Sequence, residues 1–99
     1  MSKPNAPKIE EWFITTHGYS TPSIVCGKIY HDPRWPDGTL ITTGTIQDID
    51  PEATWVQTRR TYYTLGAVKQ EWLDWAKAEN GYSLQSFITA ILRRIGKAA

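Results

Sequence analysis

Few side chains in this chain of 99 residues could support nucleophilic catalysis. Its only thiol is Cys26, and its only histidines are His17 and His31. A cysteine nucleophile needs a base within hydrogen-bond distance. Cys26 stands between Val25 and Gly27 in a β-prone segment, where a free cysteine is typically a small buried hydrophobe. We therefore expect no catalytic residues and no enzymatic activity.

Together with Asp32, the same three side chains are the available metal-ligand types. Their positions show neither a C-x-x-C nor an H-x-x-x-H spacing, which are the usual signatures of protein metal sites. The chain also has no glycine-rich phosphate loop and no nucleophile elbow. We accordingly expect neither a bound metal nor a cofactor.

A surplus of aromatic and arginine side chains is the clearest functional signal. The chain has five Trp, five Tyr and two Phe. One group surrounds Trp35 in a polar turn with two prolines, and another falls within residues 59–63. Aromatic residues and Arg are enriched at protein interfaces and dominate their binding energy. We expect the partner-binding residues to be Arg34, Trp35, Arg59, Arg60, Tyr62 and Tyr63.

Two features of this set leave alternatives open. Trp35 either folds back onto the sheet as a plug or stays exposed as an anchor for a partner. In a strand over residues 54–65, alternation would place Arg59 and Arg60 on opposite faces. One alternative is that their aliphatic stems cover apolar neighbours while the charged ends reach water. The other is that the two arginines belong to an interaction surface.

The charge balance argues against a basic nucleic-acid coat, because 11 Lys+Arg and 10 Asp+Glu give a net charge of +1. Residues 51–99 nevertheless carry seven basic and four acidic side chains. Three of the basic residues, Arg93, Arg94 and Lys97, lie at the end of the last predicted helix, where they could contact phosphates. A nucleic-acid or nucleotide-binding module, using this helix end or the Arg/Tyr strand, is the alternative function.

The first part of the chain has the composition of a sheet. Residues 9–65 are rich in Thr, Ile, Val, Trp and Tyr, which favour strands. The last two predicted strands are joined by a short turn and should form an antiparallel hairpin. The four predicted strands cover residues 9–16, 24–30, 39–49 and 54–65.

The second part, residues 67–96, has helical periodicity. Asn80 and Gly81 should end a first helix, and Ser83 should cap a second. We expect an α+β domain: an antiparallel sheet of about four strands, followed by a C-terminal helical hairpin packed on one face. This single domain should span residues 9–96 after a flexible N-terminal arm of residues 1–8.

A pattern of turn and strand residues over about residues 9–75 resembles small accessory proteins of tailed bacteriophages and prophages. It comprises Trp12, His17-Gly18-Tyr19-Ser20, Gly27-Lys28-Ile29-Tyr30, Asp37-Gly38, Thr42-Thr43, Ile49-Asp50, Thr58-Arg59 and Tyr63-Thr64-Leu65-Gly66. The resemblance implies a protein that binds and disables a host protein such as a nuclease or another defence component. It assigns no functional residue.

The expected function is therefore that of a non-enzymatic interaction protein, a phage-type inhibitor or modulator that binds a host protein through an Arg/aromatic surface. The polar N-terminus lacks the apolar run of a signal peptide, and a lone cysteine suits a reducing compartment. We expect a cytoplasmic protein without membrane contact. A second copy of the chain is a further expected partner, because a sheet covered on one face leaves the other available.

Overall fold

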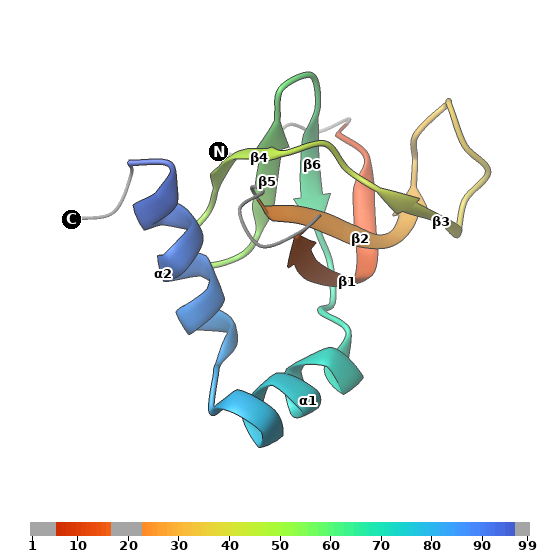
Figure 1. Ribbon diagram of the computed structural model, residues 1–99. Helices are drawn as coiled ribbons and strands as arrows, with labels where there is room; N and C mark the ends of the chain where they lie inside the picture. Colours follow the sequence, from red (N-terminus) through yellow and green to blue (C-terminus); the bar gives the residue numbers. More distant parts are fainter. Residues whose placement is uncertain (1–5, 17–22, 97–99) are drawn as a thin grey trace.

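The computed structural model describes residues 6–16 and 23–96, which form six β-strands followed by two α-helices (Figure 1). The α+β class expected from the sequence is confirmed. The elements are β1 (Lys8–Thr16), β2 (Ser23–Tyr30), β3 (Thr39–Thr42), β4 (Ile46–Ile49), β5 (Trp55–Thr58), β6 (Tyr62–Leu65), α1 (Gln70–Asn80) and α2 (Leu84–Arg94).

The six strands form one mixed sheet in the order β3-β2-β1-β6-β5-β4. Strands β1 and β6 pair in parallel, and the other neighbouring pairs are antiparallel. The prediction of about four strands in a purely antiparallel sheet is therefore wrong in detail. The predicted pairing of the last two β segments is confirmed by the antiparallel β4–β5 pair.

Two predicted strands are each divided in the structure. The segment predicted as a strand over residues 39–49 is interrupted by residues 43–45, so that it forms β3 and β4. The segment predicted over residues 54–65 folds back on itself at Arg59 and Arg60, so that it forms the β5–β6 hairpin. Both segments are rich in β-prone residues throughout, and composition alone does not mark where a strand turns.

The connection between β3 and β4 requires the sheet to be rolled. These strands lie at opposite edges of the sheet, yet only residues 43–45 separate them. The edges of a flat six-stranded sheet would be about 24 Å apart, whereas four Cα steps span at most about 15 Å. The connection crosses from β2 to β5, since the Thr43 N–H bonds to the Val25 carbonyl at 2.8 Å and Gly44 lies against Thr58. Figure 1 shows this segment running across the other strands.

A bulge in β1 ties the sheet to the segment that leads into α1. The β1–β2 register shifts between Glu10 and Phe13, and Glu11 takes a positive φ of 48°. Both Ile9 and Trp12 consequently face the core, where they are fully buried. The Trp12 indole Nε1–H donates to the Gly66 carbonyl at 2.9 Å, which holds β1 beside the end of β6.

Helix α1 ends and helix α2 begins where the sequence predicts. Gly81 ends α1 with a left-handed φ of 69°, and its N–H donates to the Lys77 carbonyl at 3.0 Å. Ser83 caps α2 and forms a reciprocal capping box with Ser86. Helix α2 lies beside β4 and sends its two buried isoleucines into the core cluster of the sheet, which comprises Ile9, Trp12, Ile14, Val25, Ile29, Ile46, Ile49, Val56, Tyr63, Leu65, Ile88 and Ile91.

Part of the predicted N-terminal arm belongs to the sheet. Strand β1 begins at Lys8, and the carbonyl of Pro7 accepts a hydrogen bond from the Thr64 N–H at 2.8 Å. Residues 1–5 of the arm lie outside the described residues. Within the part of the chain that the structure describes, neither helix is long and apolar enough to cross a bilayer.

Candidate functional site

The segment between β2 and β3, residues 31–38, is organised by the carboxylate of Asp32. This side chain is only 2% exposed and receives three hydrogen bonds from the Arg34 guanidinium, the shortest being Nη2–Oδ2 at 2.6 Å. The Arg34 backbone N–H donates to the same carboxylate at 3.0 Å. These bonds hold the pKa of Asp32 below its ordinary value and raise the pKa of Arg34.

The same bonds fix the position of Trp35. Its backbone N–H donates to the Asp32 carbonyl at 3.0 Å, and Asp37 closes the segment by accepting from the His31 N–H at 3.0 Å. The Trp35 side chain remains 45% exposed and is absent from the core cluster. Trp35 is therefore an exposed side chain and not a plug, and its role as an anchor for a partner stays a prediction. A loop that is already ordered loses less entropy when a partner binds.

Arg59 and Arg60 form the turn between β5 and β6. The turn is closed by a hydrogen bond from the Thr58 N–H to the Thr61 carbonyl at 2.9 Å. The prediction that the two arginines lie on opposite faces of one strand is wrong, because both occupy the hairpin tip, where both are exposed. A two-residue hairpin turn usually contains Gly, Asn or Asp, and none is present here.

The two segments converge on one cleft of about 500 Å³. The third wall is the connection between β3 and β4. The lining of the whole cleft consists of Arg34, Trp35, Ile41, Thr42, Thr43, Gly44, Thr45, Gln47, Thr58, Arg59, Arg60, Thr61 and Tyr63. We call this hollow the arginine cleft. Five of the six predicted partner-binding residues lie on its walls.

The arginine cleft is electropositive. Three arginines line it, and none of the described residues on its walls is acidic. The charge of Arg34 is balanced by its ion pair with the buried Asp32. Arg59 and Arg60 form no ion pair with any other residue that the structure describes. A concave wall with uncompensated cations concentrates anions in its vicinity.

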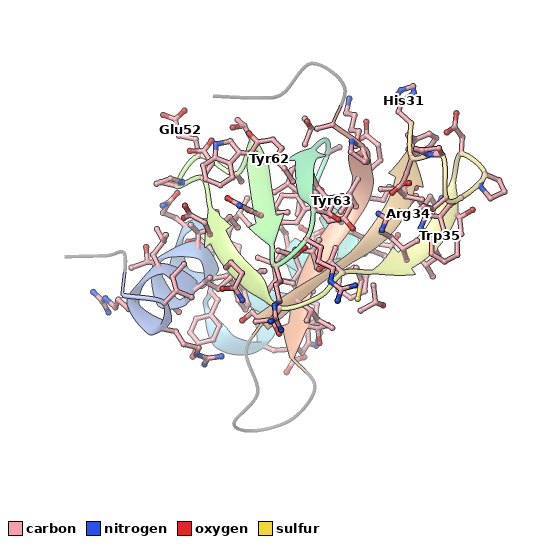
Figure 2. The ribbon with its side chains drawn as sticks, turned by 90° about the horizontal axis from the view of Figure 1, so that it is seen from above. His31, Arg34, Trp35, Glu52, Tyr62 and Tyr63 are labelled. Atoms are coloured by element: carbon pink, nitrogen blue, oxygen red, sulfur yellow. The ribbon has the colours of Figure 1, made fainter. Side chains whose placement is uncertain are left out.

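The two adjacent tyrosines of β6 have different roles. Tyr63 is 5% exposed, and its hydroxyl lies 3.4 Å from Arg34 Nη2, which donates to it at the floor of the cleft. Tyr62 lies outside the cleft, stacked on Trp55 with a centroid distance of 5.4 Å. Figure 2 shows Tyr63 on the side of Arg34 and Tyr62 on the side of Glu52. The predicted set is thus divided by the alternation of side chains along β6.

The basic helix end forms a separate surface. Arg93 and Arg94 are exposed in the last turn of α2, and Lys97 lies outside the described residues. Arg94 also lines a cavity of about 580 Å³ between the helices and the sheet, with aromatic walls that include Trp72, Trp75 and Phe87. This cavity lies where the apolar helix faces meet β1. Homodimer formation through this or any other face stays a prediction.

The residues considered for catalysis and metal binding do not gather at the cleft. The Cys26 thiol lies in β2, 3.5 Å from the Thr42 hydroxyl. His31 begins the β2–β3 segment, whereas His17 lies outside the described residues. Among the residues that the structure describes, no group of three or more His, Cys, Asp and Glu side chains comes together.

Sequence reasoning considered Asp32 only among the available metal-ligand types, and it missed both the bonds from Asp32 to Arg34 and the polar walls of the cleft. The order Asp32-Pro33-Arg34 is a signal that could have identified Asp32, because an Asp side chain commonly accepts from the backbone two residues later. The threonines of residues 42–45 carried no comparable signal. They line the cleft only because the rolled sheet brings them opposite Arg59 and Arg60.

Comparison of the chain with protein-family models, with curated proteins and with solved structures found no significant match.

Proposed function

We propose that this protein is a non-catalytic binding protein that holds an anionic group of its partner in the arginine cleft. The observation that carries the proposal is the convergence of Arg34, Trp35, Arg59 and Arg60 on one hollow from two separate loops. Arg side chains are hydrogen-bond donors at every pH of interest and match the geometry of carboxylates and phosphates. Trp35 supplies an apolar surface beside these charges.

Two classes of partner fit this description, a protein with an acidic surface and a nucleic acid. The resemblance to phage accessory proteins suggests a host protein, and the Arg/aromatic walls resemble an interface rich in binding energy. Inhibition of such a host protein by this chain is part of the same proposal. In both cases the arginine cleft is the main site of binding, and the basic end of α2 does not bind the partner by itself.

A titration with a simple polyanion tests the binding site without assuming a partner class. ¹⁵N-labelled protein is titrated with inorganic tripolyphosphate, and backbone and indole N–H signals are followed by NMR. We expect shifts at Trp35, Arg59 and Arg60, and their loss in an Arg59→Gln/Arg60→Gln variant. Lys77→Gln, which removes an exposed positive charge of α1, is the control and should behave as the wild type.

The opposite outcomes would contradict the proposal. Absence of any shift at the cleft would show that the cleft does not hold an anion. Shifts confined to Arg93 and Arg94 would place anion binding at the end of α2. Neither result can arise from unfolding of a variant, because both are observed with the wild-type protein.

A further inference from the structure

The chemistry of the cleft walls distinguishes between the two classes of anionic partner. The lining includes three arginines, five threonines and one glutamine. Protein interfaces have cores depleted in charged residues, whereas interfaces with nucleic acids are more polar and much more positively charged. Side chains of Arg, Thr and Gln are also regular donors to phosphate oxygens. The composition of the arginine cleft therefore favours a nucleic acid.

The exposed indole of Trp35 favours a single strand over a duplex. An aromatic side chain stacks most readily on a base of a single strand, because the bases of a double helix are already stacked on one another. The cleft volume of about 500 Å³ lies within the range of about 300–1,000 Å³ that is usual for small-molecule sites. This volume suits a single nucleotide unit.

The concave surface also continues beyond the cleft. A smaller hollow of about 330 Å³ shares Thr45 and Gln47 with the arginine cleft and reaches Arg94 at the end of α2. An isolated phosphate would occupy one of these hollows. A chain of several nucleotides can follow both, since Thr45 and Gln47 form a common wall.

We infer that this protein binds single-stranded nucleic acid, with one base stacked on Trp35 and the neighbouring phosphates held by Arg59 and Arg60. The inference rests on the proposed function, because it names the partner class for the same cleft. Arg34 contributes a fixed positive wall, since Asp32 and Tyr63 hold its guanidinium in place. The exposed arginines of the hairpin tip, which form no ion pair with other described residues, would contact the phosphates of the strand.

Fluorescence anisotropy with a labelled oligothymidylate of about ten nucleotides, within the usual range of site sizes, tests the inference. A labelled duplex of the same length and a labelled oligoglutamate peptide of matched charge are titrated separately for comparison. We expect the single strand to bind more tightly than either. Trp35→Ala should weaken its binding by about tenfold, and Trp35→Phe, which keeps an aromatic ring, should restore most of it. Trp75→Ala, which removes another exposed tryptophan, is the matched control and should have no effect.

Each of the following five results would overturn the inference. Tighter binding of the oligoglutamate would identify an acidic protein as the partner class and leave the proposed function intact. Equal binding of single strand and duplex, or full affinity in Trp35→Ala, would exclude base stacking on Trp35. Absence of oligonucleotide binding, together with tripolyphosphate shifts at Arg59 and Arg60, would reject the nucleic acid alone. Absence of both signals would reject the proposed function as well.

Discussion

Asp32 holds the guanidinium of Arg34 at the edge of the cleft, with 2.6 Å between Oδ2 and Nη2. The carboxylate is 2% exposed and the arginine 54% exposed, so the acid forms the base of the loop and the cation its surface. Because Arg34 also reaches Tyr63, this pair joins the β2–β3 segment to the floor of the arginine cleft. The pair should therefore affect both stability and binding.

Replacement of Asp32 by Asn should destabilise the protein. The neutral amide keeps the size of the side chain but loses charge-assisted hydrogen bonds, each of which typically contributes about 1.5–3 kcal/mol. Arg34 is largely solvated in the folded protein, so we expect a loss near 1.5 kcal/mol in the free energy of unfolding measured by urea denaturation. An unchanged unfolding midpoint would contradict this role of Asp32.

The contribution of Asp32 should also disappear in acid. Its pKa is lowered in the folded protein, chiefly by the Arg34 hydrogen bonds. The folded state thus binds this proton less readily than the unfolded chain, whose carboxyl titrates at about 3.9. The stabilisation is fully present above that value and is lost as the pH falls through the lowered pKa. Urea denaturation at a series of pH values should show wild type and Asp32→Asn converging below about pH 4. A constant difference between the two proteins would contradict this assignment.

Gly27 should tolerate no larger side chain. A Cβ at this position would lie 2.5 Å from Ile9 Cγ2 and 2.9 Å from the Glu10 carbonyl oxygen, beside the β1 bulge. Because the second contact is with backbone, relief requires movement of β1, and we expect Gly27→Ala to cost about 1–3 kcal/mol. Gly44→Ala is the control, since its Cβ would meet its nearest neighbour at 4.0 Å. Equal unfolding midpoints for the two variants would contradict the close approach of β1 and β2.

The stack of Tyr62 on Trp55 should stabilise the hairpin without taking part in binding. Its ring separation of 5.4 Å is typical of aromatic pairs that contribute about 0.5–1.5 kcal/mol beyond their buried area. We expect Tyr62→Ala to lower the free energy of unfolding by at least this amount and to leave the oligothymidylate affinity unchanged below the unfolding transition. A loss of affinity comparable to that of Trp35→Ala would place Tyr62 in the binding surface.

The salt dependence of oligonucleotide binding should show how many arginines of the cleft contact phosphates. The logarithm of the association constant for a single strand falls against the logarithm of salt concentration with a slope of about −0.7 for each phosphate contact. We expect Arg59→Gln and Arg60→Gln each to reduce that slope by about 0.7, and Lys77→Gln to leave it unchanged. A slope that is equal in all four proteins would show that the hairpin tip does not contact phosphates.

The helices and the composition of the sheet could be predicted because their signals are local. Glycine readily adopts the left-handed conformation that ends a helix, as Gly81 does after α1. The Ser83 side chain accepts a hydrogen bond from the Ser86 N–H at the start of α2. The exposure of Trp35 could not be predicted in this way, because a polar turn with two prolines is compatible both with a plug on the sheet and with an exposed side chain.

The arrangement of the site could not be predicted, because it depends on contacts between distant parts of the chain. Nothing near Arg59 and Arg60 marks a turn, so their segment looked like one long strand whose arginines point in opposite directions. The rolling of the sheet follows from the short connection between its edge strands β3 and β4, together with the pairing of β1 with β6 that joins the two halves of the sheet, and no local pattern indicates that pairing. Only that curvature brings the hairpin tip opposite Trp35.

The most direct test of the arginine cleft observes its tryptophan. Protein labelled with 5-fluorotryptophan has one ¹⁹F signal for each of its five tryptophans, and single Trp→Phe variants assign them. On titration with oligothymidylate, we predict that the Trp35 signal shifts in proportion to the bound fraction while the Trp75 signal stays in place. A shift of the Trp75 signal with no change at Trp35 would contradict binding in the cleft.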